Sequence, residues 1–247
     1  MKPPRFEGRV SLVGSGPGDP ELMTIRAQKR INQADIIIHD RLVGQRIIPL
    51  LPKKAEKIDA SKRSGKHRIP QEKINRMIVE KAREGKKVVR LKGGDPFLFG
   101  RGGEEASYLI ENGVEFEVVP GVTSAISIPA LAGIPVTHRD YASSVTIITG
   151  HRTGGRKTNW KALTELGGTL IILMGISNLQ YNMSELISSG LATTTPAALI
   201  ENGSQEGQRV LISTVEKISD LAQKEGAKPP GVIVVGDVVG LHGVLHV

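Results

Sequence analysis

The residues of this chain that could bind a ligand gather in a glycine-rich stretch at residues 88–105. An apolar run that ends at Leu91 is followed by Gly-Gly-Asp at residues 93–95, and a second glycine cluster lies at residues 100–103. Because glycine has no Cβ, a backbone rich in it can approach a ligand closely. An ordinary loop between a strand and a helix has the same composition, so both interpretations stay open on this ground.

A second glycine-rich turn, residues 14–20 (GSGPGDP), follows the apolar residues 10–13. It is similar to the G-x-G-x-x-G turn of dinucleotide-binding proteins, but Asp19 occupies the position of the third glycine. Pro17 also lacks the backbone N–H group that a bound phosphate would require. The turn therefore does not predict a site for NAD, although it remains a tight turn at the end of a strand.

An acidic residue, Asp40, follows the apolar residues 36–38 and His39. In open α/β sheets ligands bind beyond the carboxyl ends of the strands, so a carboxylate in this place can belong to a site. The alternative is an aspartate that caps a helix or stabilises a turn, and Asp40 by itself favours that alternative.

The charge balance favours an anionic partner. The 247 residues include 33 Lys and Arg against 25 Asp and Glu, a net charge of +8, and the basic residues concentrate at residues 53–68. A basic surplus attracts nucleic acid, a membrane surface or an acidic small molecule. Only 3% of the residues are aromatic and no RNA-stacking motif is present, which argues against nucleic acid.

Several classes of site and location are disfavoured by what the sequence lacks. There is no cysteine, and the six histidines form no zinc pattern, so we expect no metal site. Neither a phosphate-binding G-x-x-x-x-G-K-[ST] loop nor a G-x-S-x-G nucleophile turn occurs. The N-terminal residues (MKPPRFEGRV) have no apolar signal core, and the apolar runs are too short to span a bilayer. These features predict a soluble, cytoplasmic protein with no membrane partner.

Strands and helices must hold the glycine-rich turns in place, and the sequence indicates them by apolar runs that alternate with helical patterns. In the first half we expect strands at residues 10–13, 36–38, 87–91 and 116–119, helices at 21–34, 74–82 and 104–111, and a loop at 41–70. That alternation predicts a largely parallel sheet. Glu104 and Glu105 suit the first turn of the last helix, where the helix dipole favours negative charge.

Pro120 and Gly121 mark the predicted domain boundary, with an N-terminal α/β domain at residues 1–119 and a C-terminal α/β domain at residues 120–247. The second half has predicted strands at residues 144–149, 169–174, 196–201, 208–213 and 231–236, with helices that begin near residues 160, 178 and 215. Residues 207–213 can form a hairpin with the preceding strand, which would make this sheet mixed. The expected fold class is α/β.

Several motifs occur in one order along the chain: residues 10–19 (VSLVGSGPGD), 40–43 (DRLV), 91–105 (LKGGDPFLFGRGGEE), 119–124 (VPGVTS) and 132–137 (AGIPVT). Together they closely resemble the tetrapyrrole methylases, and within them the group that methylates uroporphyrinogen III. The run at residues 91–105 is long and specific, whereas the first turn is shared across the superfamily. His39 departs from the tyrosine common in the family, which puts in doubt a hydroxyl at that position but not the neighbouring aspartate.

The resemblance implies two α/β domains with S-adenosyl-L-methionine in the cleft between them, and a homodimer. It implies methylation of uroporphyrinogen III at C2 and then C7 to give precorrin-2, in tetrapyrrole biosynthesis of the sirohaem or cobalamin type, with S-adenosyl-L-homocysteine as the other product. The methyl donor is an activated sulfonium, so the reaction needs no metal. A polycarboxylate substrate matches the basic surplus.

The resemblance also assigns residues. Asp40 corresponds to the family's proton acceptor and Lys62 to its proposed proton donor. From charge we further expect basic side chains at residues 53–68, Arg63 among them, and Arg101 to bind substrate carboxylates. The cofactor would contact strand-end turns at Pro17, Gly93, Gly94, Asp95, Thr123, Ser124, Met174, Asn202 and Gly231.

Alternatives remain for these roles and for the function. Asp40 could instead orient the macrocycle by accepting pyrrole N–H bonds, and Lys62 could instead pair with a substrate carboxylate. A methylase of a later corrin intermediate and diphthine synthase are alternatives within the superfamily, against which residues 91–105 and 70–75 (PQEKIN) argue. A non-enzymatic cofactor- or RNA-binding module is the alternative from another class.

Overall fold

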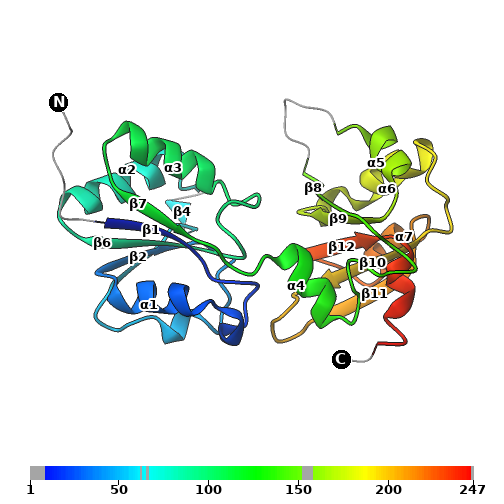
Figure 1. The fold of residues 1–247 in the computed structure, drawn as a ribbon, viewed down its shortest axis with the longest axis horizontal. Coiled ribbons are helices and arrows are strands. Elements are labelled where there is room, and N and C mark those ends of the chain that lie inside the picture. The colour runs from blue at the N-terminus through cyan, green and yellow to red at the C-terminus, as the bar shows by residue number, and fades with distance from the viewer. Residues whose placement is uncertain (1–8, 62, 65–66, 152–157, 246–247) are drawn as a thin grey trace. The chain divides into compact units, whose positions relative to one another are not determined.

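Each half of the chain folds around its own five-stranded sheet in the computed structural model (Figure 1). The chain divides into two units, Met1–Thr123 and Ser124–Val247. The structure describes residues 9–61, 63–64, 67–151 and 158–245, with the backbone alone for residues 63–64 and 67–68. Within these ranges no helix has the length and apolar character needed to cross a lipid bilayer.

The sheet of the first unit is entirely parallel, in the order β3-β2-β6-β1-β7. The elements of this unit are β1 (Arg9–Gly14), η1 (Pro20–Leu22), α1 (Ile25–Gln33), β2 (Ile36–His39), η2 (Ile48–Leu50), β3 (Glu56–Asp59), β4 (Arg63–Ser64), β5 (His67–Arg68), α2 (Gln71–Arg83), β6 (Lys87–Lys92), α3 (Gly102–Glu111) and β7 (Phe116–Val119). β4 and β5 pair with each other in a small antiparallel sheet. Because the five long strands are parallel, their carboxyl ends meet at one edge, as the sequence predicts.

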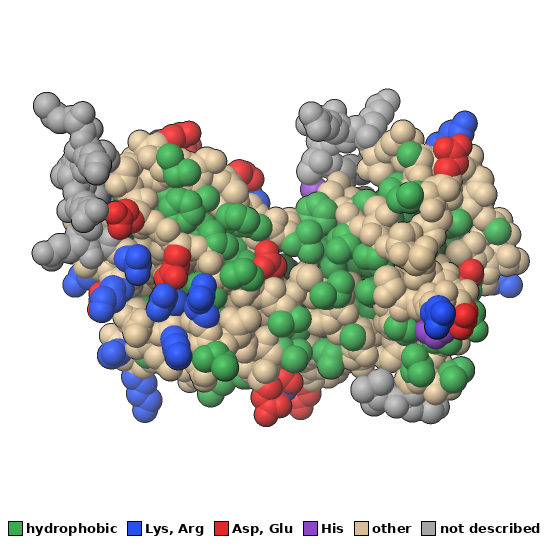
Figure 2. All heavy atoms as spheres, in the orientation of Figure 1, with side chains coloured by type: hydrophobic (Ala, Val, Ile, Leu, Met, Phe, Trp, Pro, Cys, Tyr) green, Lys and Arg blue, Asp and Glu red, His purple; other side chains and the backbone are tan. Residues whose placement is uncertain are grey.

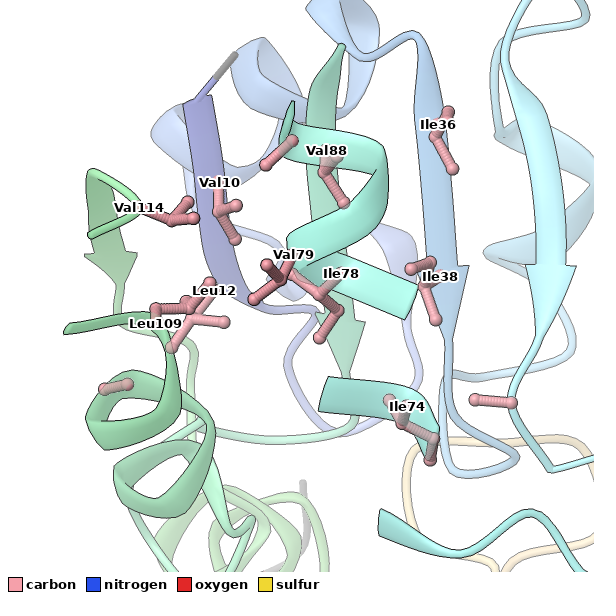
Figure 3. Packing of buried hydrophobic residues seen from close by; sticks show 13 residues of the cluster. Val10, Leu12, Ile36, Ile38, Ile74, Ile78, Val79, Val88, Leu109 and Val114 are labelled. Carbon is pink, nitrogen blue, oxygen red and sulfur yellow. The ribbon is translucent and has the colours of Figure 1, made fainter. Parts of the chain in front are cut away.

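Helices cover both faces of this sheet, with α1 on one side and α2 and α3 on the other (Figure 1). Successive residues of a strand point to opposite faces, so β1, β2, β6 and β7 contribute to both cores. The face toward α2 and α3 is formed by side chains that Figure 3 labels, among them Val10, Leu12, Ile36, Ile38 and Val88. The face toward α1 is formed by Val13, Ile37, Val89, Leu91 and Val119.

Two local features of the first unit differ from the prediction. The helix predicted at residues 21–34 is divided, because Thr24 has an extended backbone and its hydroxyl oxygen accepts the Ala27 N–H at 3.1 Å as an N-cap. The loop predicted at residues 41–70 contains β3, an edge strand that pairs with β2. Glu56 and Lys57 of β3 are exposed, so the strand has no apolar pattern by which the sequence could mark it.

The second unit has a mixed sheet in the order β11-β10-β12-β9-β8, in which only β8 and β9 are parallel. Its elements are α4 (Ser124–Leu131), β8 (Val145–Thr149), α5 (Trp160–Leu166), β9 (Thr169–Leu173), η3 (Ile176–Asn178), α6 (Leu179–Ser188), β10 (Pro196–Glu201), β11 (Arg209–Thr214), α7 (Ile218–Lys224), β12 (Gly231–Val235) and η4 (Asp237–Leu241). The antiparallel pair β10–β11 is the predicted hairpin. α5, α6 and α7 pack on one apolar core with this sheet, and α4 contacts β9 and β12. The predicted α/β class is confirmed in both units.

Loops at the carboxyl edge of the first sheet pack main chain against main chain. The Gly16 N–H donates to the Gly94 carbonyl at 3.2 Å, and the Gly94 N–H donates to the Gly16 carbonyl at 2.7 Å. Gly94 has a φ of 64°, in the left-handed region that favours glycine. A Cβ added to Gly121 would lie 2.2 Å from the Gly94 carbonyl oxygen, so this crossing leaves no room for a side chain.

Replacing Gly121 with alanine is therefore expected to destabilise the first unit by about 1–3 kcal/mol, the usual cost of forcing extra volume into a packed region. Urea unfolding followed by circular dichroism measures the loss. Gly103→Ala is the control, because no atom lies within 4 Å of a Cβ at Gly103 and alanine favours the helix in which Gly103 stands. Equal unfolding midpoints for the two variants would contradict this account of the crossing.

Candidate functional site

Predicted site residues of the first unit follow the carboxyl ends of three neighbouring strands. Pro17 lies in the turn after β1, Asp40 follows β2 directly, and residues 93–95 follow β6. The Asp40 N–H donates to the Leu91 carbonyl at 3.1 Å, so Asp40 is fixed against β6. Lys62, which follows β3 in the sequence, lies outside the described residues.

The glycines of this edge are explained by packing of the chain against itself. A Cβ on Gly93 would lie 2.5 Å from the Leu42 carbonyl oxygen, and one on Gly14 would lie 2.5 Å from the Gly94 carbonyl oxygen. The close approach that the glycine-rich composition predicts is thus made here by neighbouring loops of the same unit. These contacts favour the interpretation of an ordinary loop between a strand and a helix for the glycines. Ligand binding is then left to the groups that stay accessible.

Asp95 fastens the loop after β6. Its Oδ1 accepts the Phe97 N–H at 2.8 Å, and its Oδ2 accepts the Gly121 N–H at 3.1 Å. The side chain is half-buried, and a carboxylate has more lone pairs than these two bonds use. Asp95 therefore has a structural role in the loop and keeps acceptor capacity for a ligand.

Asp40 is the accessible end of a buried group of charges. Its Oδ1 accepts a hydrogen bond from Nη2 of Arg90, and its Oδ2 lies 3.6 Å from Nζ of Lys92. The Asp40 side chain is 33% exposed, whereas those of Arg90 and Lys92 are each 2% exposed. Two cations thus lie behind one carboxylate at the edge of the sheet.

Glu105 completes this group from α3. Its Oε1 accepts hydrogen bonds from Nε of Arg90 at 2.9 Å, from Nζ of Lys92 at 3.1 Å and from the Gln71 amide at 2.9 Å. The Gln71 amide also donates to Asn75 of the same helix. The Glu105 side chain is fully buried, so its charge is balanced by the two cations and not by water.

Burial and neighbouring charges act differently on the two cations. Burial lowers the pKa of Lys92, the nearby Arg90 lowers it further, and Glu105 and Asp40 offset only part of this effect. Burial also opposes the charge of Arg90, but Asp40 and Glu105 outweigh it and raise the pKa of that guanidinium. The same buried site thus opposes the charge of Lys92 and favours that of Arg90.

Sequence reasoning missed Arg90, Lys92 and Glu105 as parts of this group. It treated the strand before Gly93 as apolar and assigned Glu105 to the helix dipole. A signal was available, because Arg90 and Lys92 are two positions apart in a strand and so point to the same face. Two charges on one face of a buried strand require an opposite charge nearby.

Of the two predicted substrate residues, the structure describes the side chain of Arg101, which is not part of this group. Arg101 has a φ of 60°, precedes α3, and is 54% exposed in an ion pair with Glu104 whose atoms Nη2 and Oε2 lie 2.6 Å apart. The backbone of Arg63 pairs with that of Arg68 in the small sheet. The side chain of Arg63 lies outside the described part of the chain.

The second unit brings three predicted cofactor residues to one edge of its sheet. Met174 follows β9, Asn202 follows β10 and Gly231 begins β12, and β12 runs antiparallel to both of its neighbours. The Asn202 N–H donates to the carbonyl of Pro230, the residue before Gly231, at 3.1 Å. Met174 and Asn202 have φ values of 54° and 47°, unusual for residues other than glycine and frequent where a backbone is held for function.

The remaining predicted cofactor residues, Thr123 and Ser124, are consecutive. Thr123 is the last residue of the first unit, and Ser124 is the first residue of the second unit and of α4. Both are half-buried.

Comparison with known proteins gives one family. Residues 9–219 match the family described as tetrapyrrole (corrin/porphyrin) methylases. The chain is 52% identical over 241 residues to the "S-adenosyl-L-methionine-dependent uroporphyrinogen III methyltransferase" of Methanosarcina barkeri, covering 96% of this chain and 94% of that protein.

Two solved structures extend the comparison. A uroporphyrin-III C-methyltransferase of Thermus thermophilus, complexed with S-adenosylhomocysteine, has a TM-score of 0.81 and 36% identity, and covers 95% of this chain and 100% of that one. A cobalt precorrin-4 methyltransferase has a TM-score of 0.84 but 27% identity, and covers 96% of this chain and 98% of that one. The fold is thus shared by relatives whose names give different substrates, whereas sequence identity separates them.

Proposed function

The chain belongs to the tetrapyrrole (corrin/porphyrin) methylase family, and from that premise we propose that it is an S-adenosyl-L-methionine-dependent uroporphyrinogen-III C-methyltransferase. The observation that carries the proposal is the 52% identity, over 96% of the chain, with the Methanosarcina barkeri enzyme of that name. The reaction methylates uroporphyrinogen III at C2 and C7 and gives precorrin-2. The product feeds tetrapyrrole biosynthesis of the sirohaem or cobalamin type.

The residues present fit the cofactor. S-adenosyl-L-methionine supplies an activated methyl group when it is bound. In this proposal Asp95, which retains acceptor capacity, pairs with the cationic part of the cofactor. Met174, Asn202 and Gly231, which lie at one edge of the second sheet, form further contacts. Pro17, Gly93, Gly94, Thr123 and Ser124 join them in the proposal as further contacts.

Proton transfer is assigned to Asp40 and Lys62. Methylation of an electron-rich pyrrole carbon leaves the macrocycle with a positive charge, and loss of a proton restores neutrality. Asp40 accepts that proton, because its carboxylate is the accessible member of the charged group behind it. Lys62 returns a proton to a neighbouring position of the macrocycle. We place the protein in the cytoplasm as a homodimer.

Mass spectrometry of the product tests the proposed function. The protein is incubated with uroporphyrinogen III and methyl-labelled S-adenosyl-L-methionine under anaerobic conditions, and the product is expected to gain two labelled methyl groups. Tight binding of S-adenosyl-L-homocysteine with no label in the tetrapyrrole would instead support a non-enzymatic binding module.

A methylase of a later corrin intermediate is the second candidate, because the cobalt precorrin-4 methyltransferase has the same fold with a TM-score of 0.84. Its 27% identity is about half the identity to the uroporphyrinogen III enzyme, which favours the first candidate. A competition assay with both tetrapyrroles in one tube decides between them. Label that appears only in the later intermediate would replace the proposed substrate.

Asp95→Asn is expected to weaken binding of S-adenosyl-L-homocysteine about tenfold, or 1.4 kcal/mol, because it removes the charge that pairs with the ligand's amino group. Isothermal titration calorimetry measures the change. Asp59→Asn is the matched control, since Asp59 also accepts an N–H from the residue two positions later, that of Ser61, at 2.9 Å. Unchanged affinity of Asp95→Asn would remove Asp95 from the cofactor site.

The KM for uroporphyrinogen III is expected to rise severalfold between 0.05 and 0.5 M salt, because ions screen attraction between exposed charges. Lys and Arg side chains gather on the first unit in Figure 2, and Lys53, Lys54 and Lys57 are exposed. Initial rates at each salt concentration measure the effect, with the affinity for S-adenosyl-L-homocysteine as a control for general salt damage. A KM independent of salt would exclude long-range attraction of the substrate by these residues.

A further inference from the structure

Glu201 is a buried carboxylate at the edge of the second sheet that includes Asn202 and Gly231. It ends β10, its side chain is 3% exposed, and in the strand register it lies between Arg209 of β11 and Gly231 of β12. Its Oε2 accepts hydrogen bonds from Nε of Arg209 at 2.8 Å and from Nη2 of the same guanidinium. Its Oε1 accepts the Lys228 N–H at 2.6 Å. Glu201 therefore links β11 to the segment that leads into β12.

The bond to Lys228 fixes a segment that has few backbone donors of its own. Residues 229 and 230 are prolines, which lack a backbone N–H, so Lys228 carries the last N–H before Gly231. Asn202, the residue after Glu201, donates its own N–H to the Pro230 carbonyl at 3.1 Å. Two consecutive residues at the end of β10 thus hold residues 228–230 from both ends.

Arg209 supports this arrangement from the edge strand. Nε and Nη2 of its guanidinium bind Glu201, while Nη1 donates to the carbonyl of Glu225, at the end of α7, at 3.1 Å. Hydrogen bonds between a guanidinium and a carboxylate are stronger than those between neutral groups. The Glu201 carboxylate is therefore held in the orientation in which its other oxygen meets Lys228.

We infer that Glu201 is a positioning residue for cofactor binding. Its carboxylate holds residues 228–230 against the end of β10 and thereby fixes Asn202 and Gly231 relative to each other. This inference rests on the proposed function, because only that proposal makes Asn202 and Gly231 cofactor contacts. The pairing of β10 with β12 ends at Glu201 and Gly231, so within the described structure residues 228–230 are bonded to β10 through the Glu201 side chain and the Asn202 N–H.

The direct experiment is calorimetric titration of S-adenosyl-L-homocysteine into the full chain without tetrapyrrole. Glu201→Gln keeps the shape of the side chain but places an NH2 group opposite either the Lys228 N–H or the Arg209 guanidinium, so one of the two links is lost. The dissociation constant is expected to rise about tenfold, the effect of losing one hydrogen bond to a charged group. Parent affinity in Glu201→Gln would overturn the inference.

Arg209→Gln is the second variant, because the Arg209 side chain is 44% exposed and its loss leaves the core of the unit intact. It frees Oε2 of Glu201 and should weaken binding of S-adenosyl-L-homocysteine in the same direction. If Glu201→Gln does not fold, Arg209→Gln decides the question, and parent affinity there would overturn the inference.

Two controls separate positioning from general loss of stability. Glu117→Gln breaks the same kind of pair in the first unit, where the Glu117 carboxylate binds Nε of Arg30 and, at 3.1 Å, its Nη2, and it should keep the parent affinity. Ile218→Val removes one methyl group from the core that also contains Trp160 and should lower the stability of the second unit without changing affinity. Trp160 is the single tryptophan of the chain, so its fluorescence follows the unfolding of that unit in urea. An affinity loss in Ile218→Val equal to that in Glu201→Gln would reduce Glu201 to a structural role and overturn the inference.

Turnover supplies the second readout. In Glu201→Gln the KM for S-adenosyl-L-methionine should rise together with the dissociation constant, while the rate at saturating cofactor and substrate should stay within about twofold of the parent rate. A slower rate at saturation with parent affinity would overturn the inference. A parent protein that binds S-adenosyl-L-homocysteine but methylates no uroporphyrinogen III would refute the proposed function, and the affinities would still decide the role of Glu201. A parent protein that binds no S-adenosyl-L-homocysteine would overturn both.

Discussion

Asp40→Asn is expected to slow methyl transfer in a single turnover by roughly 10²–10⁴-fold, the usual contribution of a positioned acid or base. The amide has nearly the shape of the carboxylate but cannot accept a proton at working pH. If Asp40 only oriented the macrocycle, saturating substrate would fill the site and the chemical step would keep its rate. Rapid-quench measurement at several substrate concentrations therefore distinguishes proton transfer from orientation.

Asp35→Asn is the control for this experiment. Asp35 stands just before the other end of β2, is exposed, and has an Oδ2 that accepts the Lys87 N–H at 2.8 Å. Asp35→Asn should keep the parent rate, because Asp35 lies at the amino ends of the parallel strands, whereas Asp40 lies at their carboxyl ends. An Asp40→Asn protein that turns over at the parent rate when saturated would end the assignment of Asp40 as proton acceptor.

Among the substitutions considered, Glu105→Gln is expected to lower the free energy of unfolding most, by about 3–5 kcal/mol. Removal of one partner from a buried ion pair leaves uncompensated charge. Arg90 and Lys92 would then share Asp40 as their carboxylate within the described group. Urea unfolding gives the free energy, provided that the two units unfold in one transition or are resolved by separate probes.

The neighbouring residue provides a control one position away. Glu104 is 57% exposed and pairs with Arg101 within α3, so Glu104→Gln should cost less than about 1 kcal/mol, as is usual for surface ion pairs. The contrast between two consecutive glutamates tests burial, since the substitution and the helix are the same. Similar losses for both variants would show that the charge balance behind Asp40 contributes little to folding.

The sequence could predict the family and the class of fold because these depend on long motifs and on alternation of elements. Residues 91–105 point to the tetrapyrrole methylases, and the family match over residues 9–219 confirms that membership. Parallel pairing in the first sheet and the β10–β11 hairpin also follow from local patterns. The strand β3 escaped prediction because an edge strand with exposed charges lacks the apolar run by which buried strands are found.

The group behind Asp40 could not be assembled from local patterns. Arg90 and Asp40 are 50 positions apart, and Glu105 is a further 15 positions along the chain. Whether a charged residue in a strand is buried depends on partners that only the fold brings together. The motif run contained Lys92 and Glu105, but its spacing does not tell which of two adjacent glutamates turns inward.

The close backbone contacts of Gly14 and Gly121 with Gly94, at the carboxyl edge of the first sheet, limit which substitutions this sequence can accept. When a new side chain collides with another side chain, a second mutation that trims the neighbour can rescue the protein. At Gly14 and Gly121 the first obstacle is the carbonyl oxygen of Gly94, which every amino acid has. No single substitution at position 94 can remove it, so a search for suppressors of a mutation at Gly121 should find none at that position. These glycines are then fixed by geometry whatever tetrapyrrole the protein acts on, and their presence carries little information about substrate.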